Sequence, residues 1–226
     1  MSLDPLDVQK LYVAYLGRPA DAAGFRAWSS ANITLNEAAN MFSQSPEYAA
    51  LHSSNTTVDI IVQSYQFLFN KTPDVDGLRA WYNAVEFNHT IPKSLLPLAI
   101  ANGANLYDSQ VAYSKYIAAA GFTNHLDTTA EIINYPTAAG EKVGRDYLAS
   151  ITAFSYPSPA EIDAWIRKIP GAGFAAEQHF DKALAAFGDV AQDVSVAHHQ
   201  DQQHDVIDGH ASLIGQHGHT LLEAVY

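Results

Sequence analysis

The sequence contains no cysteine among its 226 residues. Disulfide bonds, thiol catalysis and cysteine-ligated zinc are therefore excluded. Basic residues are also scarce: 12 Lys and Arg stand against 24 Asp and Glu, for a net charge of −12. This balance argues against a nucleic-acid partner, because a phosphate backbone is bound through Lys and Arg.

Long apolar runs are missing as well. The first residues have neither the basic start nor the apolar stretch of a signal peptide, and no run approaches the roughly 18 apolar residues of a membrane span. We therefore expect no cleaved signal peptide and no transmembrane segment. Strand signals are poor, since no stretch alternates polar and apolar residues for long. Because 48 % of the residues are hydrophobic, a substantial core is expected, within an all-α, multi-helix domain.

An internal repeat organises the chain. LYVAYLGRPADAAGFRAW, at residues 11–28, returns 53 residues later as SYQFLFNKTPDVDGLRAW. Such a repeat fixes the architecture, so we expect two degenerate helix-corner-helix units over residues 8–52 and 59–105. A third, weaker copy is expected over residues 140–187, where Pro and Trp recur at the same spacing. The repeats would form one domain over residues 1–187.

Each corner carries the residues that end one helix and begin the next. Gly17 and Asn70 are residue types that tolerate the left-handed conformation of a helix C-cap. Asp21 and Asp74 are natural N-caps for the following helix. Farther along, the sequence predicts a helix over residues 106–120 that Gly121 terminates.

Gly and Trp recur in the second helix of each corner. Gly24 and Gly77 suit either a close approach of two helices or a contact with a ligand. Trp28 and Trp81 lie one turn farther on, on the apolar face. We expect these two indole rings to be buried to the same degree.

The first copy resembles a known family. Its pattern, Tyr-x3-Leu-Gly-Arg-Pro-x-Asp-x2-Gly-x3-Trp, is similar to the signature of a bacterial helical domain of unknown function. That domain occurs in secreted and S-layer proteins and is distantly like phycobilisome linker domains. Residues 62–78 also resemble the N-terminal anchoring region of alphaproteobacterial S-layer proteins, which docks on lipopolysaccharide.

The resemblance implies a secreted, cell-surface-associated, non-enzymatic protein. Its partner would be envelope polysaccharide, lipopolysaccharide or an S-layer-type protein. The family supplies no catalytic residue, and no carboxylate spacing in the chain selects a glycosidase pair, so a carbohydrate-active enzyme stays a third alternative.

Four basic residues recur beside the corners and are the candidate glycan or partner contacts: Arg18, Arg26, Lys71 and Arg79. Their alternative role is to bind helix ends and nearby Asp side chains. Because the net charge repels an anionic polysaccharide, binding needs either a local basic and aromatic patch or a divalent cation such as calcium as a bridge. Asp74 and Asp76 hint at a calcium loop, although N-capping also explains them.

Residues 188–226 have a different composition. They carry six histidines that could bind a transition metal or haem, which defines the alternative function of an extracellular metal- or haem-binding protein. These candidate ligands are His198, His199, His204, His210, His217 and His219. A polar segment that merely tolerates histidine is the other interpretation. The final residues, 223–226, are one acidic and three apolar residues. They resemble an uncleaved type I secretion signal, which implies an extracellular location.

Overall fold

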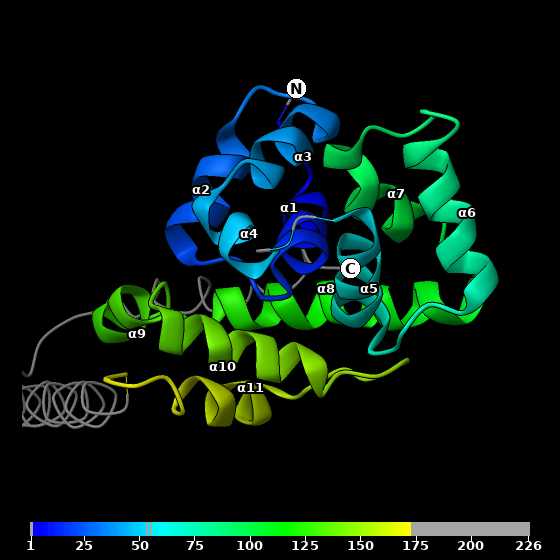
Figure 1. Ribbon diagram of the computed structural model, residues 1–226. Helices are drawn as coiled ribbons and strands as arrows, with labels where there is room; N and C mark the ends of the chain where they lie inside the picture. Colours follow the sequence, from blue (N-terminus) through cyan, green and yellow to red (C-terminus); the bar gives the residue numbers. More distant parts are fainter. Residues whose placement is uncertain (1, 53, 55, 173–226) are drawn as a thin grey trace, which may run out of the picture. The chain divides into compact units, whose positions relative to one another are not determined.

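A computed structural model describes residues 2–52, 54 and 56–172 (Figure 1). The all-α prediction is confirmed for these residues, which contain no strand and only an isolated bridge between Ser2 and Asn32. None of their helices combines the length and apolar character needed to cross a bilayer. The predicted domain end at residue 187, the His-rich segment and the secretion signal lie outside the described residues.

The first copy contains four α-helices and a π-helical turn. The first helix runs through α1 and continues as the π-helix η1, and α2, α3 and α4 follow. Their bounds are α1 Pro5–Leu11, η1 Tyr12–Leu16, α2 Ala22–Ser30, α3 Leu35–Ser43 and α4 Pro46–Leu51.

The second copy has a similar order. Its first helix, α5, is α-helical throughout, and a short 3-10 turn, η2, precedes α7. The bounds are α5 Thr57–Phe69, α6 Val75–Glu86, η2 Lys93–Leu95 and α7 Leu96–Asn102. The remaining helices are α8 Leu106–Asn124, α9 Thr129–Asn134, α10 Ala138–Ala149 and α11 Pro159–Ile166.

The predicted caps are present at both corners. Gly17 and Asn70 end their helices in the left-handed region, with φ of 66° and 57°. The carboxylate of Asp21 accepts from the Gly24 amide, and that of Asp74 accepts from the Gly77 amide, both at 2.7 Å. The chain therefore turns at both corners with the same local chemistry.

The repeated Gly makes room for a tyrosine hydroxyl. A Cβ at Gly24 would lie 2.0 Å from the Tyr12 hydroxyl oxygen, and one at Gly77 would lie 3.1 Å from that of Tyr65. The close-approach interpretation of both glycines is thus the one that the contacts support, and it is tightest in the first copy.

The two repeated Trp residues match in burial. Trp28 and Trp81 are both half-buried and pack against the core. The Trp28 ring lies 4.9 Å from the Phe42 ring, and the Trp81 indole nitrogen donates to the Tyr65 hydroxyl at 3.1 Å. Neither ring is fully enclosed, so each corner keeps part of its indole at the surface.

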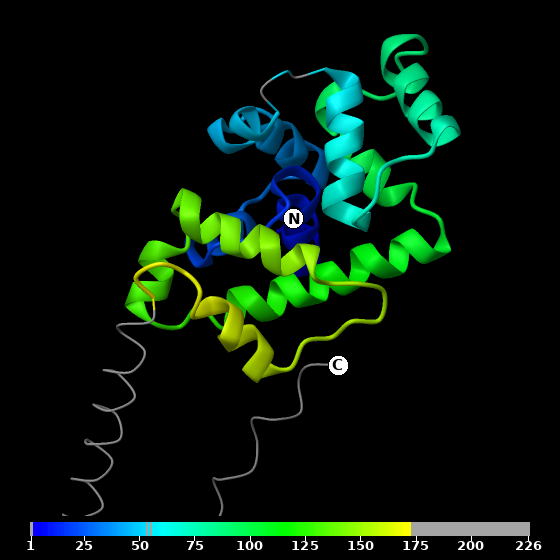
Figure 2. The ribbon, with the colours of Figure 1, turned by 60° about the horizontal axis from the view of Figure 1, so that its bottom comes forward.

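Helix α8 supports the corners. It packs against α1 and α5 and also against α10 and α11 (Figures 1 and 2). The Thr123 hydroxyl donates to the Ala20 carbonyl at 2.7 Å in the first corner. The Lys115 ammonium donates to the Phe67 carbonyl and the Asn70 amide oxygen in the second corner, at 2.5 and 2.6 Å.

The prediction that Gly121 terminates a helix is wrong. Helix α8 continues to Asn124, because Gly121 packs where a Cβ would lie only 2.9 Å from the Ile162 side chain. This glycine permits a close approach between α8 and α11. Tertiary packing therefore outweighs its low helix propensity.

Candidate ligand-binding site

Arg18, the first predicted contact residue, lies in the interior. Only 4 % of its surface is exposed. Its guanidinium donates to both carboxylate oxygens of Glu47, at 2.7 and 2.6 Å, and lies 3.3 Å from Glu141. It also stacks over the rings of Tyr12 and Tyr135. Arg18 joins the first corner to α4 and α10, and its charge is already compensated.

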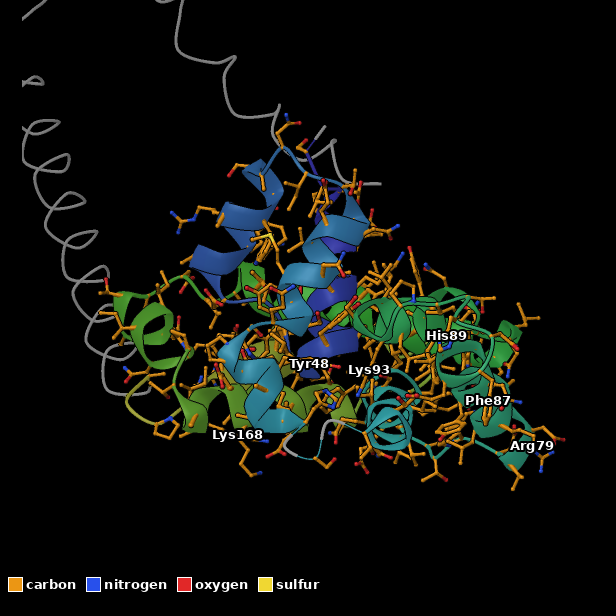
Figure 3. All side chains as sticks on the ribbon, turned by 45° about the horizontal axis from the view of Figure 1, so that its top comes forward. Tyr48, Arg79, Phe87, His89, Lys93 and Lys168 are labelled. Atoms are coloured by element: carbon orange, nitrogen blue, oxygen red, sulfur yellow. The ribbon has the colours of Figure 1, made fainter. Side chains whose placement is uncertain are left out.

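The other three basic residues are exposed. Lys71 forms an ion pair of 2.7 Å with the buried Asp108, which links the second corner to α8. Arg79 pairs with Asp76 at 3.3 Å and lies on the outer side of α6 (Figure 3). Arg26 lies on the exposed side of α2. These residues sit on separate elements, and no described pocket brings the four together.

The region of the expected third copy differs in length from the first two corners. The chain takes four residues from the C-cap Gly17 to the N-cap Asp21, but eight residues from the C-cap Ser150 to the N-cap Ser158. Ser158 and Trp165 stand at the positions that Asp74 and Trp81 occupy. The longer connection forms a loop beside α11.

Two hydrogen bonds attach this loop to the rest of the protein. The Asn70 side chain donates to the Ile151 carbonyl at 2.8 Å, and the Phe154 amide donates to the Ser114 hydroxyl at 3.0 Å. Phe154 adopts a φ of 61°, a region that a bulky residue enters only at an energetic cost. Phe154 is 67 % exposed and Tyr156 is 56 % exposed. The loop therefore presents two aromatic side chains to solvent on a strained, tethered backbone.

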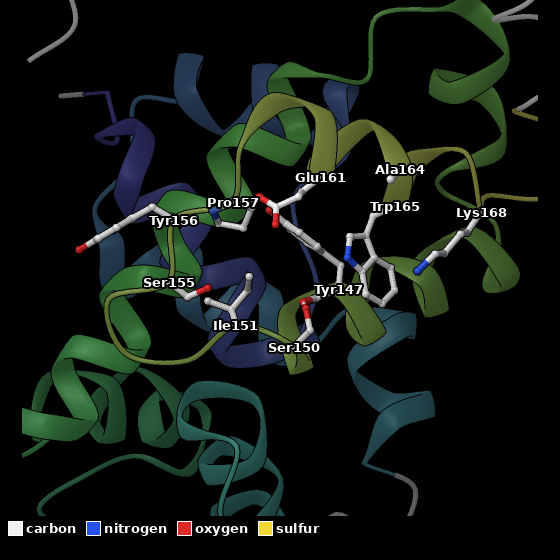
Figure 4. A pocket seen from close by; sticks show the side chains of 10 residues that line it. All are labelled: Tyr147, Ser150, Ile151, Ser155, Tyr156, Pro157, Glu161, Ala164, Trp165 and Lys168. Carbon is white, nitrogen blue, oxygen red and sulfur yellow. The ribbon is translucent and has the colours of Figure 1, made fainter.

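A cavity of about 330 Å³ lies between this loop and helices α10 and α11 (Figure 4). Trp165 and Tyr147 form its aromatic wall, and their rings meet edge to face at 5.9 Å. Lys168 extends toward Trp165, whereas Tyr156 extends away from it. The Lys168 ammonium lies 3.3 Å from the centre of the indole ring. The cavity is within the usual size range of ligand pockets, roughly 300–1,000 Å³.

Besides its aromatic residues, the cavity is lined by four polar side chains: Glu161, Lys168, Ser150 and Ser155. Glu161 stands at the position of Gly77, whose missing side chain admits a tyrosine in the second copy. The Tyr147 hydroxyl donates to the Ala118 carbonyl at 3.2 Å. The replacement of Gly by Glu and the longer loop both accompany the open cavity.

Glu161 is an ionised hydrogen-bond acceptor. One carboxylate oxygen accepts from the Ser158 amide at 2.7 Å and from its hydroxyl at 2.8 Å. These two bonds lower the pKa of Glu161 below its usual value. The carboxylate is therefore charged at neutral pH and is a poor proton donor.

The predicted metal ligands cannot be placed on this fold. The six histidines of residues 198–219 lie outside the described residues, and within residues 2–172 no three His, Asp or Glu side chains converge as a metal site. Asp74 accepts from the Gly77 amide and Asp76 pairs with Arg79. Both aspartates therefore have structural partners in the second corner.

Sequence reasoning identified Trp165 as part of a third copy but did not identify the cavity. The signal in the sequence was Glu161 at the position of Gly77, since the added loop length is visible only from the helix caps. Searches of protein-family models, of curated proteins and of solved structures gave no match to this chain.

Proposed function

We propose that this protein is a non-enzymatic, secreted, cell-surface-associated protein that binds envelope polysaccharide through the α10–α11 cavity. The observation that carries the proposal is a half-buried Trp165 ring beside Glu161 and Lys168 in one cavity. The apolar face of a sugar ring packs against indole and buries carbon from water. Sugar hydroxyls can donate to the Glu161 carboxylate and accept from the Lys168 ammonium.

The composition of the cavity favours binding over hydrolysis. Glycosidases use two carboxyl groups, one of them with a raised pKa so that it can donate a proton. Among the described residues that line the cavity, Glu161 is the only acidic side chain, and its pKa is lowered. The cavity thus lacks the pair that hydrolysis requires.

We place the glycan contact here rather than at the four repeated basic residues. Arg18 is enclosed and Lys71 is committed to Asp108. Arg26 and Arg79 remain exposed on different helices. The negative net charge still opposes an anionic polysaccharide, so calcium is expected to strengthen its binding.

The test is cosedimentation of the full chain with polysaccharide purified from the cell envelope. Trp165→Leu removes the flat ring from the cavity, and Trp28→Leu makes the same change at a half-buried Trp in the first corner. Both variants should lose similar stability, but only Trp165→Leu should lose binding, by about tenfold or more. Equal binding by the two variants would refute the proposed site.

The same assay separates the alternatives. An Arg26→Gln/Arg79→Gln variant should retain binding if the cavity is the contact. Loss of binding in that variant would return the contact to the corners. Release of reducing sugar would indicate an enzyme, and binding only to cells that retain their protein surface layer would indicate a protein partner.

A further inference from the structure

One aromatic residue of the α10–α11 cavity is not part of the wall that Trp165 and Tyr147 form. Tyr156 also lines the cavity, and Figure 4 shows it on the opposite side from Trp165, with Pro157 and Glu161 between them. Among the described residues, no other ring contacts Tyr156 and no group forms a hydrogen bond with its hydroxyl. Because Tyr156 is also 56 % exposed, its ring and its hydroxyl are both accessible to a ligand.

The turn between α10 and α11 does not explain this aromatic residue. The two corners reverse the chain through residues 18–20 and 71–73, neither of which contains an aromatic side chain. The α10–α11 connection carries both Phe154 and Tyr156, and of these two only Tyr156 lines the cavity. An exposed tyrosine at this place is therefore an addition that chain reversal does not need.

The backbone holds Tyr156 from both sides. Before it, the Phe154 amide donates to the Ser114 hydroxyl at 3.0 Å, and the Ser155 amide donates to the Thr152 carbonyl at 3.1 Å. After it, Pro157 sterically restricts residue 156 to extended conformations, and Ser158 caps α11. A tyrosine on a fixed backbone has only two side-chain torsions to lose on binding, so the entropic cost of a contact is small.

The size of the cavity limits how much of a polysaccharide it can enclose. Its volume of about 330 Å³ is at the small end of the usual range of ligand pockets, roughly 300–1,000 Å³. A polymer that stacks one sugar ring on Trp165 must therefore continue outside the cavity. A chain that crosses the cavity from Trp165 leaves it beside Tyr156 (Figure 4).

We infer that Tyr156 is a second stacking surface, so that the site binds a run of consecutive sugar rings in one linear glycan. This inference rests on the proposed function. One ring would pack on Trp165 and a later ring on Tyr156, where sugar carbon is buried against an aromatic face. Because both rings belong to one molecule, the second contact forms without a second loss of translational freedom. Long glycan segments are then the preferred ligands, and single sugars are weak ones.

The test uses the full chain and fragments of the envelope polysaccharide. Partial acid hydrolysis and size separation give single sugars, short fragments and long fragments, and calorimetric titration at fixed calcium measures each affinity. The affinity of the wild type should rise with fragment length and level off once a fragment reaches both rings. Tyr156→Leu should bind long fragments about tenfold more weakly but short fragments and single sugars like the wild type.

Two further variants identify what Tyr156 contributes. Tyr156→Phe keeps the ring and removes the hydroxyl, so it should retain most of the affinity for long fragments. Tyr107→Leu makes the Tyr-to-Leu change at a tyrosine that is 66 % exposed on α8 and does not line the cavity, so it should bind like the wild type. Because Tyr156 is exposed, both of its variants should melt at the temperature of the wild type.

The outcomes separate this inference from the proposed function. If Trp165→Leu loses the long fragments and Tyr156→Leu binds them like the wild type, the proposed function stands and the second stacking surface is wrong. Equal affinity of the wild type for single sugars and long fragments would also overturn the inference, as would an equal loss in Tyr156→Phe and Tyr156→Leu. Full binding by Trp165→Leu would overturn the proposed site, and the inference with it.

Discussion

Removal of the Arg18 charge tests whether the signature arginine is a structural element or a surface contact. Arg18→Met deletes a guanidinium that is 4 % exposed and forms two short bonds to Glu47. Removing one partner of a buried ion pair typically costs about 3–5 kcal/mol, because the other charge stays buried and unpaired. The Glu47 side chain is 21 % exposed and keeps a longer ion pair with Arg145, at 3.4 Å, so the expected loss lies near the lower end, about 3 kcal/mol.

Arg79→Met is the matched control for this substitution. Arg79 and Asp76 have side chains that are 66 % and 93 % exposed, so the free energy of unfolding should fall by less than about 1 kcal/mol. Urea titration followed by circular dichroism measures both losses. For a domain of this size, Arg18→Met should lower the melting temperature by roughly 6–12 °C.

A double variant separates the missing charge from the missing packing. Arg18→Met/Glu47→Met removes both partners and should recover part of the stability that Arg18→Met loses. If Arg18→Met costs no more than Arg79→Met, the structural role assigned to the signature arginine is wrong.

Other predictions concern the remaining sites. Burial lowers the pKa of Lys115 from 10.5 to about 7, so the unfolded chain binds more protons between these values. The free energy of unfolding should therefore fall as pH drops from about 10 to 7, by up to about 1.4 kcal/mol per pH unit. Lys115→Met should flatten this part of the pH profile measured by urea titration. An unchanged slope would show that Lys115 does not cause the pH dependence. Gly24→Ala should destabilise the protein by about 1–3 kcal/mol, because the new Cβ would clash with the Tyr12 hydroxyl. Gly77→Ala should change the stability by less than about 1 kcal/mol, because its contact with Tyr65 is longer. Equal changes in melting temperature for the two variants would contradict this difference. Deletion of residues 221–226 should leave the melting curve unchanged but keep the protein inside the cell, and normal secretion of the truncated chain would reject the C-terminal signal.

Local chemistry in the sequence predicted the corners well. Gly17 and Asn70 accept a left-handed conformation, and Asp21 and Asp74 cap the next helix, because these preferences depend on a few adjacent residues. The all-α class followed from apolar periodicity in the same way.

Long-range contacts were not predictable from the repeat. Arg18 is buried because Glu47 and Glu141 approach it from helices that are distant in the sequence. No local sequence pattern predicts these contacts. Gly121 continues a helix because Ile162 packs against it. The positive φ of Phe154 depends on a tether to Ser114, which lies 40 residues away. These features arise from contacts between helices that are distant in the sequence, not from the corners themselves.

Occupancy of the α10–α11 cavity can be measured most directly by the fluorescence of Trp165. The chain has three Trp residues, so a Trp28→Phe/Trp81→Phe variant leaves Trp165 as the sole indole emitter. Titration with soluble envelope polysaccharide should change its emission saturably, and adding Lys168→Ala should weaken the apparent affinity. Emission that stays constant while the variant still cosediments with the polysaccharide would contradict binding at this cavity.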